Sequence, residues 1–273
     1  MISKWLISFA LLYISAVALI ACSNPAGDFF YGALGLGEQK ILVATNNAGA
    51  PTIVMYDMNG EFVRVVADYA SVNDIPKGIA PFDAFNITVL LDGVDRLSRL
   101  PIFGGTSTDF TNTNLTGTLF HLAYDSKAGI YYAAEGNTIE AFTAEGVRSG
   151  NPYINTPLGS CALNVVRGLA VTSDQRLFVV GTGNDDLNVY DVSTSTAACL
   201  TANTTFGNID PVAVIVHSNG LVYVATQGDD RVYSFANDGS GAGTVVWDTD
   251  LLTISNPTAL LELPMVRSWS PRT

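Results

Sequence analysis

The chain has 273 residues, with 13 Lys and Arg against 25 Asp and Glu, so its formal net charge is −12 at pH 7. A chain this acidic, without a cluster of basic residues, is a poor match for nucleic acid or for an anionic lipid surface. Its two histidines, His121 and His217, and three cysteines leave few ligands for a zinc site. Its length suits one large β domain or two small ones.

The first 21 residues have the pattern of an export signal. Lys4 provides a positive start, Trp5–Ala18 is an apolar run, and Leu19-Ile20-Ala21-Cys22 follows. That tetrapeptide resembles the bacterial lipoprotein signal. The resemblance implies a signal peptide over residues 1–21, cleavage before Cys22, and acyl chains such as palmitate on Cys22. Residues 22–38 would then form a lipidated N-terminus and tether.

Two other interpretations of this segment stay open, namely an uncleaved membrane helix and an ordinary secretory signal in which Cys22 is incidental. The apolar stretch Trp5–Ala21 is at the short limit for a membrane span. Ser23 after the cysteine resembles the default signal for sorting to an outer membrane. We therefore expect a lipid anchor in the bacterial cell envelope, at the outer membrane.

A repeated sequence pattern organises the rest of the chain. Gly220–Gly239 predicts two short strands separated by a Gly-Asp-Asp turn and followed by an Asp-Gly hairpin turn. The pattern occurs earlier at Arg176–Ser193, where Gly183 matches Gly228 at an offset of 45 residues. Weaker copies begin at Gly129 and at Lys40. Self-similarity at this period is typical of a propeller or a solenoid.

The copies predict an all-β fold, a β-propeller of four-stranded blades, with five repeats over residues 39–264 and an atypical tail over 265–273. The expected inner strands are Gly78–Phe82, Leu119–Tyr124, Gly168–Thr172, Val212–Val216 and Thr258–Leu263. The expected second strands are Ile41–Thr45, Ile87–Leu91, Ile130–Ala134, Leu177–Gly181 and Leu221–Thr226. The first repeat lacks an inner strand and the last lacks its followers, so pairing Thr258–Leu263 with Ile41–Thr45 would close the ring. A truncated ring of six or seven blades is the alternative.

Gly220–Gly239 and Arg176–Ser193 resemble the NHL-repeat family of β-propellers. The match consists of a strand, a Gly-Asp/Asn-Asp turn, a strand that ends on an aromatic residue, and, in Gly220–Gly239, a closing Asp-Gly turn. It covers two of the five repeats well and the others loosely. The resemblance implies a propeller whose loops bind a partner or peptide, with no chemistry common to the family.

The turns between second and third strands contain seven acidic residues. They are Asp92, Asp95, Glu135, Asp185, Asp186, Asp229 and Asp230. These turns emerge on one face of a propeller, so the sequence predicts an acidic ring around one mouth of the central channel. Three interpretations are open: a Ca²⁺ site, a docking surface for a cationic partner, and solvated turns in which Asp is simply a good turn former.

Cys161 and Cys199 form an even pair once Cys22 carries lipid, and in an exported protein we expect a disulfide between them. Two buried free thiols are the alternative.

No catalytic motif of the GxSxG, HExxH or GxxxxGK[ST] kind occurs. We therefore expect a membrane-tethered binding or scaffold module without catalysis or cofactor, whose protein or peptide partner the sequence does not name. The alternative is a calcium-dependent propeller hydrolase of the lactonase or esterase kind. The inner strands offer it no carboxylate at their centres.

Overall fold

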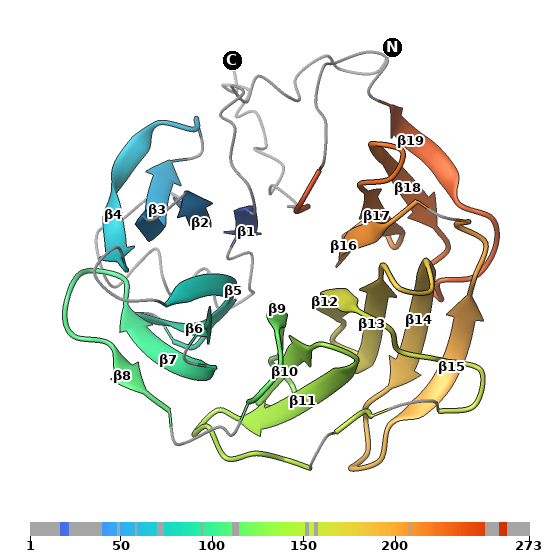
Figure 1. The fold of residues 1–273 in the computed structure, drawn as a ribbon, viewed down its shortest axis with the longest axis horizontal. Coiled ribbons are helices and arrows are strands. Elements are labelled where there is room, and N and C mark those ends of the chain that lie inside the picture. Colours follow the sequence, from blue (N-terminus) through green and yellow to red (C-terminus); the bar gives the residue numbers. More distant parts are fainter. Residues whose placement is uncertain are drawn as a thin grey trace, which may run out of the picture.

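A computed structural model describes residues 17–21, 40–47, 50–57, 59–69, 74–83, 85–93, 95–110, 115–150, 153–155, 158–207, 209–248 and 257–260. Five antiparallel sheets are arranged in a ring, as the blades of a five-bladed β-propeller (Figure 1). Four sheets contain four strands and one contains three. The predicted tether (22–38) and tail (265–273) lie outside the described residues.

Each blade is a meander that starts at the centre of the ring. The innermost strands are β1 (Val17–Ala21), β5 (Ile75–Pro81), β9 (Leu119–Asp125), β12 (Val166–Val171) and β16 (Pro211–Val216). The second strands are β2 (Lys40–Asn47), β6 (Asn86–Asp92), β10 (Ile130–Glu135), β13 (Arg176–Gly181) and β17 (Val222–Thr226). The third strands are β3 (Ala50–Asp57), β7 (Arg96–Pro101), β11 (Thr138–Thr143), β14 (Asp186–Asp191) and β18 (Arg231–Phe235). The outer strands are β4 (Phe62–Asp68), β8 (Thr108–Asp109), β15 (Ala198–Asn203) and β19 (Thr244–Asp248).

With the blades numbered 1 to 5 in chain order, the predicted inner and second strands of blades 2 to 5 and the predicted second strand of blade 1 are confirmed. Blade 3 is the sheet of three strands. Isolated bridges from Ile139 to Ile154 and from Phe142 to Arg148 occupy the place of its fourth strand. The outer position is thus present in this blade as a broken strand.

The prediction that Thr258–Leu263 supplies the inner strand of blade 1 is wrong for this structure. Pro257–Leu260 is not part of a strand, and residues 261–263 lie outside the described residues. The inner position is taken by β1, which pairs antiparallel with β2 and sets Leu19 opposite Val43. Val17–Ala21 is an apolar run that suits a buried strand as well as a signal peptide. Among the described residues, no helix is long and apolar enough to span a membrane.

Both faces of a blade are covered by neighbouring blades, which explains the continuous apolar runs of the second strands. In β13, Leu177, Phe178, Val179 and Val180 are each at most 1% exposed. Successive side chains of a strand point to opposite faces. Accordingly, Leu177 and Val179 join the core between blades 3 and 4, and the other two join the core between blades 4 and 5.

Four hydrophobic clusters lie between successive blades, from the blade 1–blade 2 contact to the blade 4–blade 5 contact. The described residues contain no corresponding cluster between blade 5 and blade 1. We call this place the seam. It lies at the top of the ring in Figure 1.

A β-bulge recurs near the start of the four inner strands β5, β9, β12 and β16. In blades 2 and 4 a glycine follows the bulge, where the backbones of adjacent inner strands approach most closely. A Cβ on Gly78 would lie 2.6 Å from the Leu122 nitrogen, and one on Gly168 would lie 2.9 Å from the Val212 carbonyl oxygen. Glycine at these positions therefore sets how tightly the blades pack around the centre.

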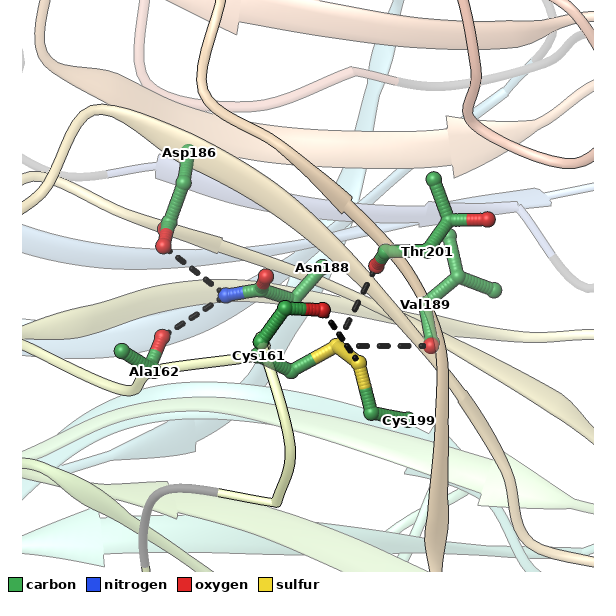
Figure 2. The surroundings of a disulfide bond; sticks show 8 residues. Cys161, Ala162, Asp186, Asn188, Val189, Cys199 and Thr201 are labelled. Carbon is green, nitrogen blue, oxygen red and sulfur yellow. Dashed lines mark hydrogen bonds between the residues drawn. A yellow bond between two sulfur atoms is a disulfide. The ribbon is translucent and has the colours of Figure 1, made fainter.

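The predicted disulfide is present: Cys161 and Cys199 are joined, with their Cα atoms 5.7 Å apart. Figure 2 shows that Cys161 comes from the segment leading into β12 and Cys199 from β15, the outer strand of the same blade. The bond therefore fastens the segment that enters blade 4 to that blade's outer edge.

Replacing Gly168 with Ala should destabilise the ring, because the new methyl group meets the backbone of the next inner strand. We expect the unfolding free energy, measured by urea titration, to fall by an amount near the upper end of the range of roughly 1–3 kcal/mol. Gly207→Ala is the control, since Gly207 has φ +62° but no atom within 4 Å of a Cβ. It should cost only about 1 kcal/mol. An equal or smaller loss for Gly168→Ala would contradict the close approach.

Removing the disulfide by the double substitution Cys161→Ala and Cys199→Ala should cost about 3–4 kcal/mol, because the bond closes a loop with a sequence separation of 38 residues. A reductant should lower the thermal midpoint of the exported wild type but leave that of the double variant unchanged. Non-reducing peptide mass mapping should recover the linked peptides. Free thiols on both cysteines in exported protein would refute the bond.

Candidate functional site

The seven acidic residues of the predicted ring lie in or beside the turns between second and third strands. All strands are antiparallel, so these turns and the loops that lead into the inner strands meet at one end of the ring, which we call the mouth. The seven side chains are half-buried or buried. Glu135 and Asp186 are the most enclosed, with 7% and 4% exposed.

Side chains of these turns hold the segment that enters the next blade. The Leu119 backbone N–H donates to Asp92 Oδ1 (3.5 Å), that of Val165 donates to Asn137 Oδ1 (2.8 Å), and that of Asp210 donates to Asp185 Oδ1 (2.9 Å). We call this repeated bond the latch. It links blade 2 to 3, 3 to 4, and 4 to 5.

Other acidic side chains of the mouth are also engaged within the protein. Glu135 Oε1 accepts the backbone N–H groups of Thr116 and Gly117, each at 2.5 Å. Asp229 accepts the hydroxyl groups of Thr226 and Tyr233. These carboxylates have a structural role, because their hydrogen bonds order the loops around them.

Backbone conformation explains why Asp recurs at one position of the turns. Asp95, Asp185 and Asp230 have φ of 51°, 51° and 54°, in the left-handed region that Asn and Asp tolerate better than most residues. Each of the three directly precedes the first or second residue of a third strand. The repeat therefore selects Asp here for the geometry of the turn.

Asp186 differs from the rest because its carboxylate is nearly out of contact with water. Burial raises the pKa of Asp186 to about 6, although hydrogen bonds from Asn188 and Asn184 lower it. Asn188 Nδ2 donates to Asp186 Oδ2 (2.9 Å) and to the Ala162 carbonyl (2.7 Å), close to the disulfide (Figure 2). The pair ties β14 to the segment entering blade 4.

Acidic side chains also occupy turns at the opposite end of the ring. There, Asp57, Asp83, Asp125 and Asp238 accept backbone N–H groups two to four residues further on. Such bonds are the usual reason for Asp in turns. The acidic ring is thus one part of a general use of Asp in turns. Among the described residues, no three His, Cys, Asp or Glu side chains gather closely enough to hold a metal ion.

The mouth also contains basic and aromatic side chains that the sequence analysis did not single out. The bulge places Lys77 in β5, Phe120 in β9 and Arg167 in β12 at equivalent positions. Lys77 Nζ lies 3.4 Å from Asp92 Oδ2, and the Arg167 guanidinium lies 4.5 Å from the centre of the Phe120 ring. The repeated Lys-Gly and Arg-Gly pairs were the signal for these positions.

The two histidines lie in a strand and in a turn. His121 lies in β9, and burial lowers its pKa to about 4, so it is neutral at physiological pH. His217 follows β16 in a turn, where its Nδ1 accepts the Asn219 backbone N–H (3.0 Å). This bond gives His217 a structural role in its turn.

An exposed aromatic patch at the end opposite the mouth is the strongest candidate for a binding surface. Phe85 and Phe103 are 47% and 43% exposed. The guanidinium of Arg64, in β4, is 5.5 Å from the centre of the Phe103 ring. The Ile102 N–H donates to the Phe85 carbonyl (2.9 Å), so the loops bearing the two rings are adjacent. We call Phe85, Phe103 and Arg64 the aromatic patch.

Three chain segments contribute to the aromatic patch, from the outer strand of blade 1 and from two turns of blade 2. Phe62, which is 59% exposed, lies outside the aromatic patch, because a β-bulge puts it on the other face of β4 from Arg64, where it packs edge-on against Tyr56 with ring centres 6.1 Å apart. Sequence reasoning missed the patch because its residues come from three separate segments of the chain.

Comparison with known proteins gives relatives by fold alone. No protein-family model matches the chain, and no curated protein matches it. A chain from the crystal structure of a nidogen/laminin complex superposes with TM-score 0.61 at 13% identity, over 91% of this chain and 82% of the other. Virginiamycin B lyase from Staphylococcus aureus superposes with TM-score 0.57 at 12% identity, over 76% of this chain and 66% of the other. These neighbours are β-propeller proteins of the NHL and YVTN type.

The latch can be tested at Asp185. Asp185→Ala removes the acceptor and places Ala at a positive φ, so unfolding free energy should fall by about 1–2 kcal/mol. Asp185→Asn keeps an acceptor oxygen, and Asn also tolerates this φ. Its loss of unfolding free energy should therefore be only a small fraction of the loss for Asp185→Ala. Urea titration of both variants measures the difference. Equal losses for Asn and Ala would mean that the negative charge, and not the latch, is what matters.

Proposed function

We propose that this protein is an exported, lipid-anchored β-propeller of the bacterial cell envelope that binds a protein partner through the aromatic patch. The proposal combines the lipoprotein-like signal ending at Cys22 with the pair Cys161–Cys199, which is joined in the structure. Disulfides form and persist in oxidising compartments outside the cytoplasm. Cys22 itself lies outside the described residues, so its lipidation rests on the sequence.

The exposed aromatic patch is the single observation that carries the binding role. Aromatic residues and Arg are enriched at the centres of protein interfaces, where rings bury much area at low entropic cost. Phe85 and Phe103 are half-exposed at the same end of the ring, and the Arg64 guanidinium lies against the Phe103 ring, so this surface has that composition. This location differs from the mouth that the sequence favoured, because the acidic groups there are engaged in latches and turns.

The structural neighbours include a propeller in a protein–protein complex and a propeller enzyme, so fold alone does not choose between binding and catalysis. The calcium-dependent hydrolase remains the rival. Stoichiometric metal in purified protein, with a Ca²⁺-dependent rise in thermal midpoint, would favour that rival, because a ligand at 100 times its Kd adds about 2.7 kcal/mol.

The binding role is tested with the double variant Phe85→Ser and Phe103→Ser. Tagged wild type is expressed in the native envelope, crosslinked in place and purified, and the recovered partner is quantified by mass spectrometry. We expect the partner to be lost from the variant while the protein level and thermal midpoint stay close to wild type, because these rings are largely exposed.

A second double variant provides the matched control. Leu200 and Val246 are 53% and 48% exposed and lie in β15 and β19, the outer strands of blades 4 and 5. Replacing both with Ser removes a similar exposure of apolar side chains elsewhere, and should leave partner recovery unchanged. Equal recovery from wild type and both variants would refute binding through the aromatic patch.

A further inference from the structure

The β-bulge of each of the four inner strands β5, β9, β12 and β16 places one extra residue at the mouth. These residues are Lys77, Phe120, Arg167 and Val212. Two of the four are cations, in a protein with a formal net charge of −12. In so acidic a protein, a cation without a carboxylate partner is unexpected.

Lys77 is neutralised inside its own blade. Its Nζ lies 3.4 Å from Asp92 Oδ2. Asp92 is the residue of β6 that pairs with Ile75, two positions before Lys77. The position opposite the second residue before the bulge therefore supplies the counter-charge in blade 2.

The equivalent position in blade 4 carries no charge. Thr182 occupies it, and its backbone N–H donates to the carbonyl of Val165 (3.2 Å), two positions before Arg167. Arg167 makes no ion pair within the described part of the chain, and its Nε is buried without a hydrogen-bond partner. The guanidinium lies 4.5 Å from the centre of the Phe120 ring. Burial lowers the pKa of Arg167, although the charge of Asp210 raises it. Arg167 is thus a half-buried cation with an unused donor.

The backbone at Val165 strengthens this contrast. Val165 has φ 48°, which is unusual for a β-branched residue. Asp210 holds the same place directly before the inner strand of blade 5, with φ 47°, and Asp tolerates this conformation better. Asp at position 165 would suit the backbone and would bring a carboxylate toward Arg167. Blade 4 has valine there instead, at a cost in backbone strain. The sequence thus leaves the charge of Arg167 uncompensated at two positions.

A carboxylate is the ligand that fits these surroundings. A guanidinium can donate two parallel N–H groups to a carboxylate while its face lies on an aromatic ring. The nearby charge of Asp210 disfavours anions with more than one negative charge, so a single carboxylate is favoured over phosphate. The Phe120 ring provides apolar surface beside the guanidinium, which suits a ligand with an apolar group next to its carboxylate.

We infer that Arg167 and Phe120 form a binding site, between blades 3 and 4 at the mouth, for a monocarboxylate that carries an apolar group. The carboxylate can belong to a small aromatic acid or to the C-terminus of a peptide, which share this chemistry. The charge of this ligand is opposite to that of the calcium ion or cationic partner that the acidic turns suggested. The site lies at the other end of the ring from the aromatic patch and does not depend on the proposed function.

Benzoate is the probe for this site, and benzamide, which has a similar shape without the charge, is its control. The Kd is measured on the purified full chain by ligand-observed NMR titration. We expect wild type to bind benzoate in preference to benzamide. Arg167→Gln should weaken benzoate binding by about tenfold or more, because hydrogen bonds to a charged group are lost. Lys77→Gln is the matched control. It removes the cation that Asp92 already neutralises and should leave the Kd close to that of wild type.

Two substitutions at position 165 separate a ligand site from an arginine with a purely structural role. Val165→Asp and Val165→Asn should both raise the thermal midpoint, because Asp and Asn tolerate the positive φ better than Val does. Only Val165→Asp should weaken benzoate binding, since its carboxylate competes for the Arg167 guanidinium. A variant that is more stable than wild type and binds less benzoate has not lost binding through unfolding. Val165→Asp therefore keeps the test decisive even where Arg167→Gln folds poorly.

Three results would overturn the site: equal binding of benzoate and benzamide by wild type, unchanged benzoate binding in Arg167→Gln, or equal Kd values in Val165→Asp and Val165→Asn. An acetylated tripeptide that ends in phenylalanine distinguishes the two sources of the carboxylate. Tighter binding of its free acid than of benzoate assigns the site to a chain terminus, and weaker binding assigns it to a small acid. The double variant Phe85→Ser and Phe103→Ser should bind benzoate as wild type does, so failure of the proposed function leaves this test intact.

Discussion

The structure depends on the close approach of neighbouring inner strands at the centre of the ring. A blade has two apolar faces, and each must be covered by another blade, so no blade is stable alone. Gly78 and Gly168 allow backbone to lie against backbone at this centre, where a methyl group would not fit. The bulge beside them turns Lys77 and Arg167 out of the sheet. Packing therefore determines which residues can reach the mouth.

Turn chemistry explains many of the acidic residues. Asp185 combines a left-handed backbone conformation with the latch to Asp210, so one residue shapes its own turn and fixes the next blade. Asp83 and Asp125 cap turns at the other end with bonds to nearby N–H groups. A net charge of −12 accumulates in this way from many local requirements. It says more about solubility and repulsion of nucleic acid than about a single ligand site.

Local patterns in the sequence were sufficient for the strands and for the disulfide, because apolar runs and Gly turns report on one blade at a time. Features made by distant segments were not predictable in this way. The aromatic patch joins Arg64 to Phe85 and Phe103 only through the contact of blades 1 and 2. The inner strand of blade 1 was missed for a different reason. Val17–Ala21 satisfies the requirements of a signal peptide and of a buried strand equally, and the sequence analysis removed it before the fold was considered.

The stability of the ring depends on its closure at the seam between blades 5 and 1. In an array where each blade contacts only its neighbours, an open chain of five blades has four contacts and a closed ring has five. The terminal blades of an open array each keep one uncovered apolar face, with Val43 on one side and Tyr223 on the other. β1 completes the sheet of blade 1 at the inner edge of β2, so the sheet that borders the seam has its full four strands. The contribution of β1 to stability should therefore exceed what its length alone would suggest.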